Sequence, residues 1–357
     1  MKTYIKFITI IYLKSLFFVF FIMTSLVFIL NLLSELEFFK NESVAVSFTL
    51  FLSLLNSPSL IFEMFPFIML ITIQLFFIKI FENKELDIFK YSGLKNSSII
   101  YIISVLSIIT GILTVSLFYN VSSNMKNIYL EFKSKYTSDG KYLAVITKNG
   151  LWIKDNINNQ IIMTNSASVE QNYLINSFIT IFNEDFSVIK NIKSEKIDIS
   201  TKNWKIKNPR IYQLNNYVDK SEIQLKTNFD LNRIQTLYSN LSALNLFELY
   251  ELRKNYKKLK YSLTDIDLHI LKLVSFPIYL LLMALFSALI MLNIKKIKST
   301  TFKIFIGLFF SVIIYYLNNF SFVLGGTERI PIIFSIITPL LFLTTISCLM
   351  LYRVNDK

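Results

Sequence analysis

Long apolar runs separated by polar segments dominate the chain. A bilayer core of about 30 Å is crossed by roughly 20 helical residues, and six runs are long enough to do so. Ile and Phe are abundant in them and favour strands in water, but an open strand edge in lipid would leave backbone groups without hydrogen-bond partners. The pattern therefore predicts six transmembrane helices, at Phe7–Leu33, Pro58–Ile80, Ser98–Asn120, Ile270–Leu292, Phe302–Val323 and Pro331–Leu351.

A polar stretch, about Val121–Asp267, separates the third run from the fourth. It begins with a strong hairpin signal, because Asn149-Gly150 lies between the alternating segments Tyr142–Thr147 and Leu151–Lys154. Many short strands at this spacing indicate a sandwich or jelly roll, and helical spacing returns over Ser242–Lys260. The further predicted strands are Ile161–Ser168, Tyr173–Phe182, Phe186–Ile192, Lys196–Ser200, Asn203–Ile206 and Glu222–Thr227.

Basic residues in the short connections predict the orientation in the membrane. Thirteen of them lie in one set of connections, and the short loops on the opposite side hold only Lys40 and Arg329. The positive-inside rule therefore places both termini in the cytoplasm and the polar stretch outside it. The thirteen basic residues on the cytoplasmic side are Lys2, Lys6, Lys14, Lys79, Lys84, Lys90, Lys95, Lys295, Lys296, Lys298, Lys303, Arg353 and Lys357.

These patterns together predict an α-helical polytopic membrane protein with three transmembrane helices on each side of an inserted extracytoplasmic β jelly-roll-like domain. Residues 1–120 would hold the first three helices and 121–267 the β domain. Residues 268–357 would hold the last three helices.

Composition adds few chemical candidates. The net charge of +13 comes mostly from Lys, without a basic stripe interleaved with aromatics, so it does not indicate nucleic-acid binding. The single Cys348 allows no intrachain disulfide, and with one His269 a metal site is not expected. Walker, GxSxG and HExxH motifs do not occur. We therefore predict no catalytic residues, no metal and no cofactor.

Glu63 is the one acidic residue well inside an apolar run. A carboxylate within a membrane is a candidate functional residue. It lies about a turn and a half beyond Pro58, where the second helix is predicted to begin, so hydration near the membrane surface is the simpler interpretation.

The connection Phe81–Lys95 predicts a short helix of about 84–92 on the cytoplasmic side. Asn83 is a suitable N-cap, Glu85 favours the positive end of a helix, and Gly93 is a typical stop. Leu86, Phe89 and Gly93 would share one side, flanked by Glu85. Such a helix is either an amphipathic connector on the membrane surface or a coupling helix that inserts into a partner protein.

Asn83–Leu86 followed by Phe89–Leu94 resembles the N-S-E-L-x-x-x-R-A-A-G-[IL]-S signature of the LptF/LptG permeases, located between their second and third helices. Lys84 replaces the usual small residue, and residues 89–92 differ from R-A-A. Weaker similarities follow in the family's order at Pro58–Pro66, Asn149–Asp155, Trp204, Ser242–Leu252, Pro277–Leu289, Leu324–Gly326, Ile330-Pro331 and Pro339.

The resemblance implies a permease subunit of an ABC exporter in the bacterial inner membrane. It would pair with a second, related permease above two copies of a separate ABC ATPase, which would contact Glu85, Leu86, Phe89 and Gly93. Lipopolysaccharide would pass to a periplasmic bridge protein with a similar β domain. Length and the closing Leu324–Pro331 pattern resemble LptG slightly more than LptF.

The cargo would occupy a cavity between the first and fifth helices, with Phe28 and Ile313 as candidate contacts. Some family members meet lipid phosphates with basic residues at the outer end of the first helix, but here Ser34–Lys40 is net acidic and only Lys40 is a candidate headgroup contact. The main alternative is a non-transporting membrane sensor or scaffold with a periplasmic β domain. A lipoprotein permease or a membrane enzyme fits the sequence less well.

Overall fold

The structure is a computed structural model that describes residues 3–40, 44–134, 136, 151–157, 160–170, 172–213, 216–231, 234, 240–258, 263–293 and 299–355. The chain forms two compact units. The first combines Met1–Lys126 with Thr264–Lys357, and the second is Asn127–Leu263.

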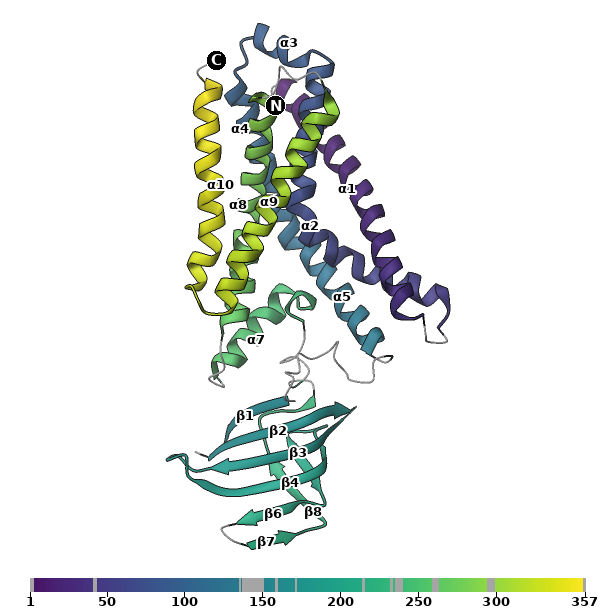
Figure 1. The fold of residues 1–357 in the computed structure, drawn as a ribbon, viewed down its shortest axis with the longest axis vertical. Coiled ribbons are helices and arrows are strands. Elements are labelled where there is room, and N and C mark those ends of the chain that lie inside the picture. The colour runs from purple at the N-terminus through teal and green to yellow at the C-terminus, as the bar shows by residue number, and fades with distance from the viewer. Residues whose placement is uncertain are drawn as a thin grey trace. The chain divides into compact units, whose positions relative to one another are not determined.

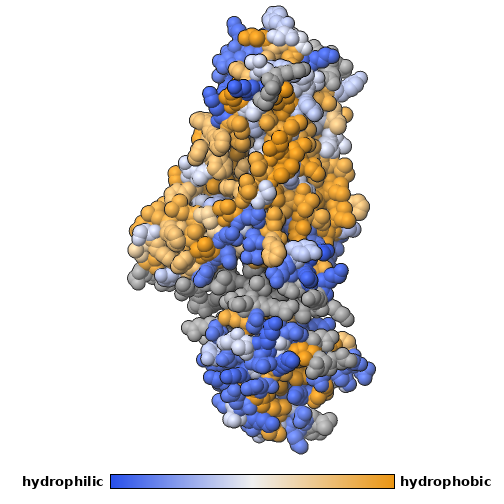
Figure 2. Space-filling view, turned by 180° about the vertical axis from the view of Figure 1, so that it is seen from behind, coloured by the Kyte–Doolittle hydropathy of each residue, from blue (hydrophilic) through white to orange (hydrophobic). Residues whose placement is uncertain are grey.

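In the described part of the chain, six helices are long and apolar enough to cross a membrane, which confirms the predicted helical, multi-pass fold. On the face drawn in Figure 2, hydrophobic side chains cover much of the surface of these helices. The third span consists of α4, a π-helical turn and α5. The elements are α1 (Thr3–Phe38), α2 (Val46–Glu82), α4 (Asn96–Leu113), the turn Thr114–Phe118, α5 (Tyr119–Ser134), α8 (Thr264–Asn293), α9 (Thr300–Gly326) and α10 (Ile332–Asn355).

Helix α2 begins at Val46, well before the predicted start at Pro58. Pro58 and Pro66 lie inside the helix, where each removes a backbone hydrogen bond, and Figure 1 shows that α2 bends along its length. The polar residues before Pro58 do not face water. The hydroxyl of Ser53 donates to the carbonyl oxygen of Thr49 at 2.8 Å, and that of Ser57 donates to Ser53 at 2.6 Å.

Helix α1 packs on α2 and α4 through one narrow stripe. Near its C-terminal end the Asn31 amide donates to the carbonyl oxygen of Ser53 at 3.1 Å, and Asn56 donates to the Asn31 side chain at 3.0 Å. Such side-chain hydrogen bonds hold helices together in lipid, where apolar burial alone gives little preference. The buried stripe comprises Ile8, Tyr12, Ser15, Val19, Met23, Val27, Asn31 and Glu35.

Glycines allow three close helix contacts in this bundle. A Cβ at Gly111 of α4 would lie 2.7 Å from the Cα of Pro277 in α8, and one at Gly325 would lie 2.5 Å from the hydroxyl of Ser335. A Cβ at Gly307 of α9 would overlap the side chain of Gln74. Small residues at such positions let helix backbones approach closely.

The second unit contains an antiparallel sheet inserted between the third and fourth spans, as predicted. Strands β1 to β4 pair in sequence order; β4 then pairs with both β5 and β6, β5 pairs with β8, and β6 pairs with β7. The jelly-roll-like topology stays a prediction; the first strand and the turn of the predicted hairpin, Tyr142–Gly150, lie outside the described residues, and its second strand, Leu151–Lys154, is part of β1. The strands are β1 (Leu151–Ile157), β2 (Gln160–Glu170), β3 (Tyr173–Phe182), β4 (Val188–Asp198), β5 (Asn203–Lys207), β6 (Arg210–Gln213), β7 (Asn216–Asp219) and β8 (Glu222–Lys226).

Two predicted strands, Phe186–Ile192 and Lys196–Ser200, form one continuous strand, β4, and the sequence missed β6 and β7. Ser194 explains the continuity: its buried hydroxyl donates to the carbonyl oxygen of Lys207 at 2.7 Å, where the partner of β4 changes from β6 to β5. Phe186 lies before the strand in a turn with φ of 59°.

The core of the second unit consists mainly of alternate strand residues. Trp204 of β5 is fully buried, and its indole N–H donates to the carbonyl oxygen of Phe229 at 2.8 Å. After the short 3-10 turn Leu241–Ala243, α7 (Leu246–Lys258) confirms the predicted return to helix. Asn245 and Glu248 cap its start reciprocally, each side chain accepting from the other's backbone N–H at 2.9 Å.

Candidate functional site

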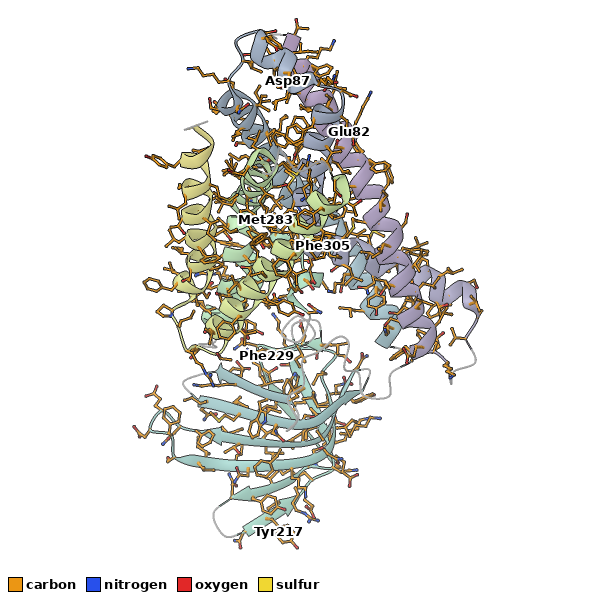
Figure 3. The ribbon with its side chains drawn as sticks, turned by 45° about the horizontal axis from the view of Figure 1, so that its top comes forward. Glu82, Asp87, Tyr217, Phe229, Met283 and Phe305 are labelled. Atoms are coloured by element: carbon orange, nitrogen blue, oxygen red, sulfur yellow. The ribbon has the colours of Figure 1, made fainter. Side chains whose placement is uncertain are left out.

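A cavity of about 760 Å³ lies inside the helical unit, between α1, α2, α8, α9 and α10. Apolar side chains supply much of its wall; Figure 3 shows one of them, Met283 of α8, among the helices. Polar side chains line it as well, from α9 and also from α1, α2 and α8; examples are Asn31, Asn56, Ser275, Tyr315 and Asn319. The cavity wall therefore combines apolar and polar side chains, which is suitable for an amphiphilic molecule.

Two oppositely charged side chains line this cavity, Glu63 of α2 and Lys272 of α8. Because α2 begins at Val46, Glu63 lies well inside its helix and not near the helix start as predicted. The Lys272 ammonium lies 5.0 Å from the centroid of the Phe322 ring, which also lines the cavity. Sequence reasoning missed Lys272, because a lysine near the start of a span is typical of a membrane surface.

The connection between the second and third spans contains a short helix, α3 (Glu85–Tyr91), inside the predicted range of about 84–92. Asn83 is the C-cap of α2, not the predicted N-cap of this helix, because its N–H bonds to the carbonyl oxygen of Lys79. Its side-chain amide instead donates to Glu85 at 3.2 Å. Gly93 ends α3 with φ of 81°, and the N–H of Leu94 bonds back to Phe89 at 2.9 Å.

Three of the four predicted coupling residues share a groove of about 560 Å³ beside α1, namely Glu85, Phe89 and Gly93. Phe89 packs edge-on against Phe7 of α1 with ring centroids 5.9 Å apart. The Oε2 atom of Glu85 is buried and has no hydrogen-bond partner within the chain's described residues.

Leu86 is not part of this groove, since it is 2% exposed and packs inside the bundle. Two large side chains of α3 are well exposed: Ile88, which also lines this groove, is 60% exposed, and Tyr91 is 92% exposed. Sequence reasoning missed both residues. An apolar stripe indicates that a helix packs against something but does not distinguish its own chain from a partner.

The remaining predicted site residues lie apart from the cavity. Lys40 is exposed just beyond the end of α1 and is not on the cavity wall. Phe28 and Ile313 do not line the cavity, but their neighbours Val27 and Val312 do. The predicted contacts thus lie next to cavity-lining residues on the first and fifth spans, α1 and α9, and their contact with a cargo stays a prediction.

Six helices long and apolar enough to cross a membrane, five of them around a cavity, and a β sheet inserted after the third define a polytopic helical membrane protein with an inserted β domain. The sequence profile of the family described as lipopolysaccharide export system permease LptF/LptG matches residues 6–353, nearly the whole chain. The chain belongs to this family. It is therefore a multi-pass inner-membrane protein and a permease component of lipopolysaccharide export.

A comparison with curated proteins finds no match. The family profile covers LptF and LptG together, so the slight preference for LptG stays a prediction.

Proposed function

We propose that this chain is one of two related permease subunits of an ABC exporter. The exporter extracts lipopolysaccharide from the inner membrane and passes it to a periplasmic bridge protein with a similar β domain, driven by two copies of a separate ATPase. The observation that carries this proposal is the cavity between α1, α2, α8, α9 and α10 in a chain of the export-permease family.

The composition of the cavity wall supports a lipid cargo. An acyl chain is accommodated by apolar side chains such as Val27, Phe62 and Met283, whereas a sugar or phosphate group needs hydrogen-bonding partners such as Tyr315 and Asn319. A charged or narrow polar pore would suit an ion, and it would leave several acyl chains in unfavourable contact with polar groups.

The exposed helices support a second permease subunit. In the apolar segment of α1, 22% of the residues are buried within the chain, and in that of α9, 17% are buried. The corresponding share for α2 is 72%. A volume of about 760 Å³ is near the upper end for drug-sized ligands, and lipopolysaccharide is far larger. A related subunit that presents its own first and fifth helices would enlarge and close the cavity.

The proposed coupling helix is α3, docked in a groove of the ATPase. In this proposal Ile88 and Tyr91 enter the ATPase groove, and Glu85 accepts a hydrogen bond from a basic ATPase side chain. Phe89 and Gly93 shape the groove beside α1, and Leu86 fixes α3 to its own bundle. The charge pattern of the connections supports cytoplasmic termini and a periplasmic β unit.

Affinity purification of the tagged full chain in mild detergent, followed by identification of its partners, tests the proposal. We expect an ABC ATPase and a second six-helix permease in stoichiometric amounts. The sensor or scaffold alternative instead predicts recovery of the chain alone, or with partners that lack an ATPase. The same purification with an Ile88→Asp variant is the control. If the variant loses the ATPase during washing and the unaltered chain retains it, the complex is specific and does not result from co-purification in shared lipid.

A further inference from the structure

One exposed face of helix α7 is apolar where the helix begins and basic where it ends. Phe247 and Tyr250 are 75% and 66% exposed, and Leu246 beside them is also exposed. Lys254 and Lys257 are exposed one and two turns further along. Since successive residues of a helix are rotated by about 100°, these five side chains fall within one arc of about 100°.

The other side of α7 packs within the protein through the buried residues Leu249 and Leu252. Of the two acidic residues of α7, Glu248 caps the start of the helix and Glu251 lies at the edge of the exposed arc. A helix of a water-soluble domain normally turns charged and polar residues away from its core. The exposed arc of α7 is half apolar, which indicates a partner that contacts apolar and basic side chains together.

The connection of α7 to the next helix shows which surface is near. Residues 259–263 join α7 to α8, which is long and apolar enough to cross a membrane. An extended chain covers at most about 3.6 Å per residue, so this connection holds the end of α7 within about 20 Å of the start of α8. The bilayer surface is therefore within reach of α7 in every state of the protein.

The chemistry of a lipid surface matches both halves of the arc. Aromatic side chains such as Phe247 and Tyr250 are favourable at the level where headgroups meet acyl chains. Lysine side chains such as Lys254 and Lys257 extend their ammonium groups toward the phosphates of anionic phospholipids. An amphipathic helix with these residues is typical of one that lies in the plane of the membrane surface.

We propose that α7 is an interfacial anchor that lies on the bilayer surface. Phe247 and Tyr250 insert among the lipids, and Lys254 and Lys257 contact anionic headgroups. The partner is the phospholipid of the surrounding membrane and not an exported cargo, so this inference goes beyond the proposed function and does not depend on it. The anchor fixes the chain at the lipid surface just before it enters the fourth span.

The test uses a spin label on the full chain in nanodiscs, with any subunits that co-purify. Cys348 is exposed, so Cys348→Ser is introduced first, and the label is attached at Phe247→Cys or at the control Asp185→Cys in the exposed turn before β4. Collisions with oxygen, which dissolves in lipid, are compared with collisions with a water-soluble nickel chelate. In nanodiscs that contain anionic phospholipid, oxygen should dominate at position 247 and the nickel chelate at position 185.

The contribution of the lysines is measured with the double variant Lys254→Gln and Lys257→Gln. One lysine near an anionic surface contributes a factor of about five to binding, so the double variant should lower the ratio of docked to undocked helix about twenty-five-fold. The ratio is obtained from the two populations in the spectrum of the label at position 247. In nanodiscs of neutral lipid the double variant should have no effect.

Two results would overturn the anchor. Dominant collisions with the nickel chelate at position 247 would show that this face of α7 lies in water. Protection of position 247 from both reagents would show that a protein covers the face instead of lipid. Equal docking of the double variant and its parent in anionic nanodiscs would refute the contact of Lys254 and Lys257 with headgroups.

Discussion

Replacing Ile88 with aspartate changes an exposed side chain of α3 without removing the residue that anchors the helix. Ile88 is 60% exposed, and full burial of such a side chain is worth about 1.5–3 kcal/mol. Covering the exposed part in an ATPase groove is therefore worth about 1–2 kcal/mol, a factor of about five to thirty in affinity. The aspartate also adds the cost of desolvating a charge. We expect Ile88→Asp to weaken ATPase binding at least tenfold.

The assay is titration of purified ATPase against the detergent-solubilised permease, with thermal unfolding measured on the same samples. Ile88→Asp should leave the unfolding temperature nearly unchanged, because more than half of the side chain is already exposed to solvent. Leu86→Ala is the matched control: removing a buried side chain costs about 2–5 kcal/mol, so it should lower the unfolding temperature as well. Wild-type ATPase affinity in both Ile88→Asp and Tyr91→Ala would show that these exposed side chains of α3 do not contact the ATPase.

Three further predictions test other parts of the account. A charge-assisted hydrogen bond is worth about 1.5–3 kcal/mol, so Glu85→Ala should reduce lipid-stimulated ATP hydrolysis, and Glu85→Lys should reduce it more by placing like charges together; equal activities would show that Glu85 meets no basic partner. Protease added to spheroplasts should cut a site inserted in the exposed turn at Asp185 and spare a C-terminal tag; cleavage of both would reverse the orientation. Gly307→Ala should lower thermal stability by about 1–3 kcal/mol because its Cβ meets Gln74, whereas Gly326→Ala has space and should be neutral; equal effects would contradict the close contact.

The sequence predicted those helices and strands that are determined by the pattern of neighbouring residues alone. Six runs of apolar residues are sufficient to predict six spans, because lipid demands length and apolarity from each helix separately. The start of α2 was wrong, since Asn56 bonds to Asn31 of another helix and thus behaves as an interior residue. The sequence likewise predicted two strands on either side of Ser194, whose bond to Lys207 supports one continuous strand, β4.

The candidate site depended on contacts that no local pattern contains. The resemblance predicted a cavity between the first and fifth helices. Val27 and Val312 line the cavity of the structure, whereas the predicted contacts Phe28 and Ile313, one position further along each helix, point in another direction and do not line it. Likewise, the apolar stripe of α3 was interpreted as an interface with a partner, and Leu86 proved to face its own bundle. Burial by the same chain and burial by a partner produce the same sequence pattern.

The central claim is that lipopolysaccharide occupies the cavity between these helices, and site-specific photo-crosslinking tests it most directly. A photoreactive residue at Val312, on the cavity wall, should capture lipopolysaccharide in cells. The same residue at Tyr101 of α4, which is 70% exposed and away from that wall, should capture ordinary phospholipid only. Equal capture of lipopolysaccharide at both positions, or none at Val312, would contradict a cargo cavity at this place.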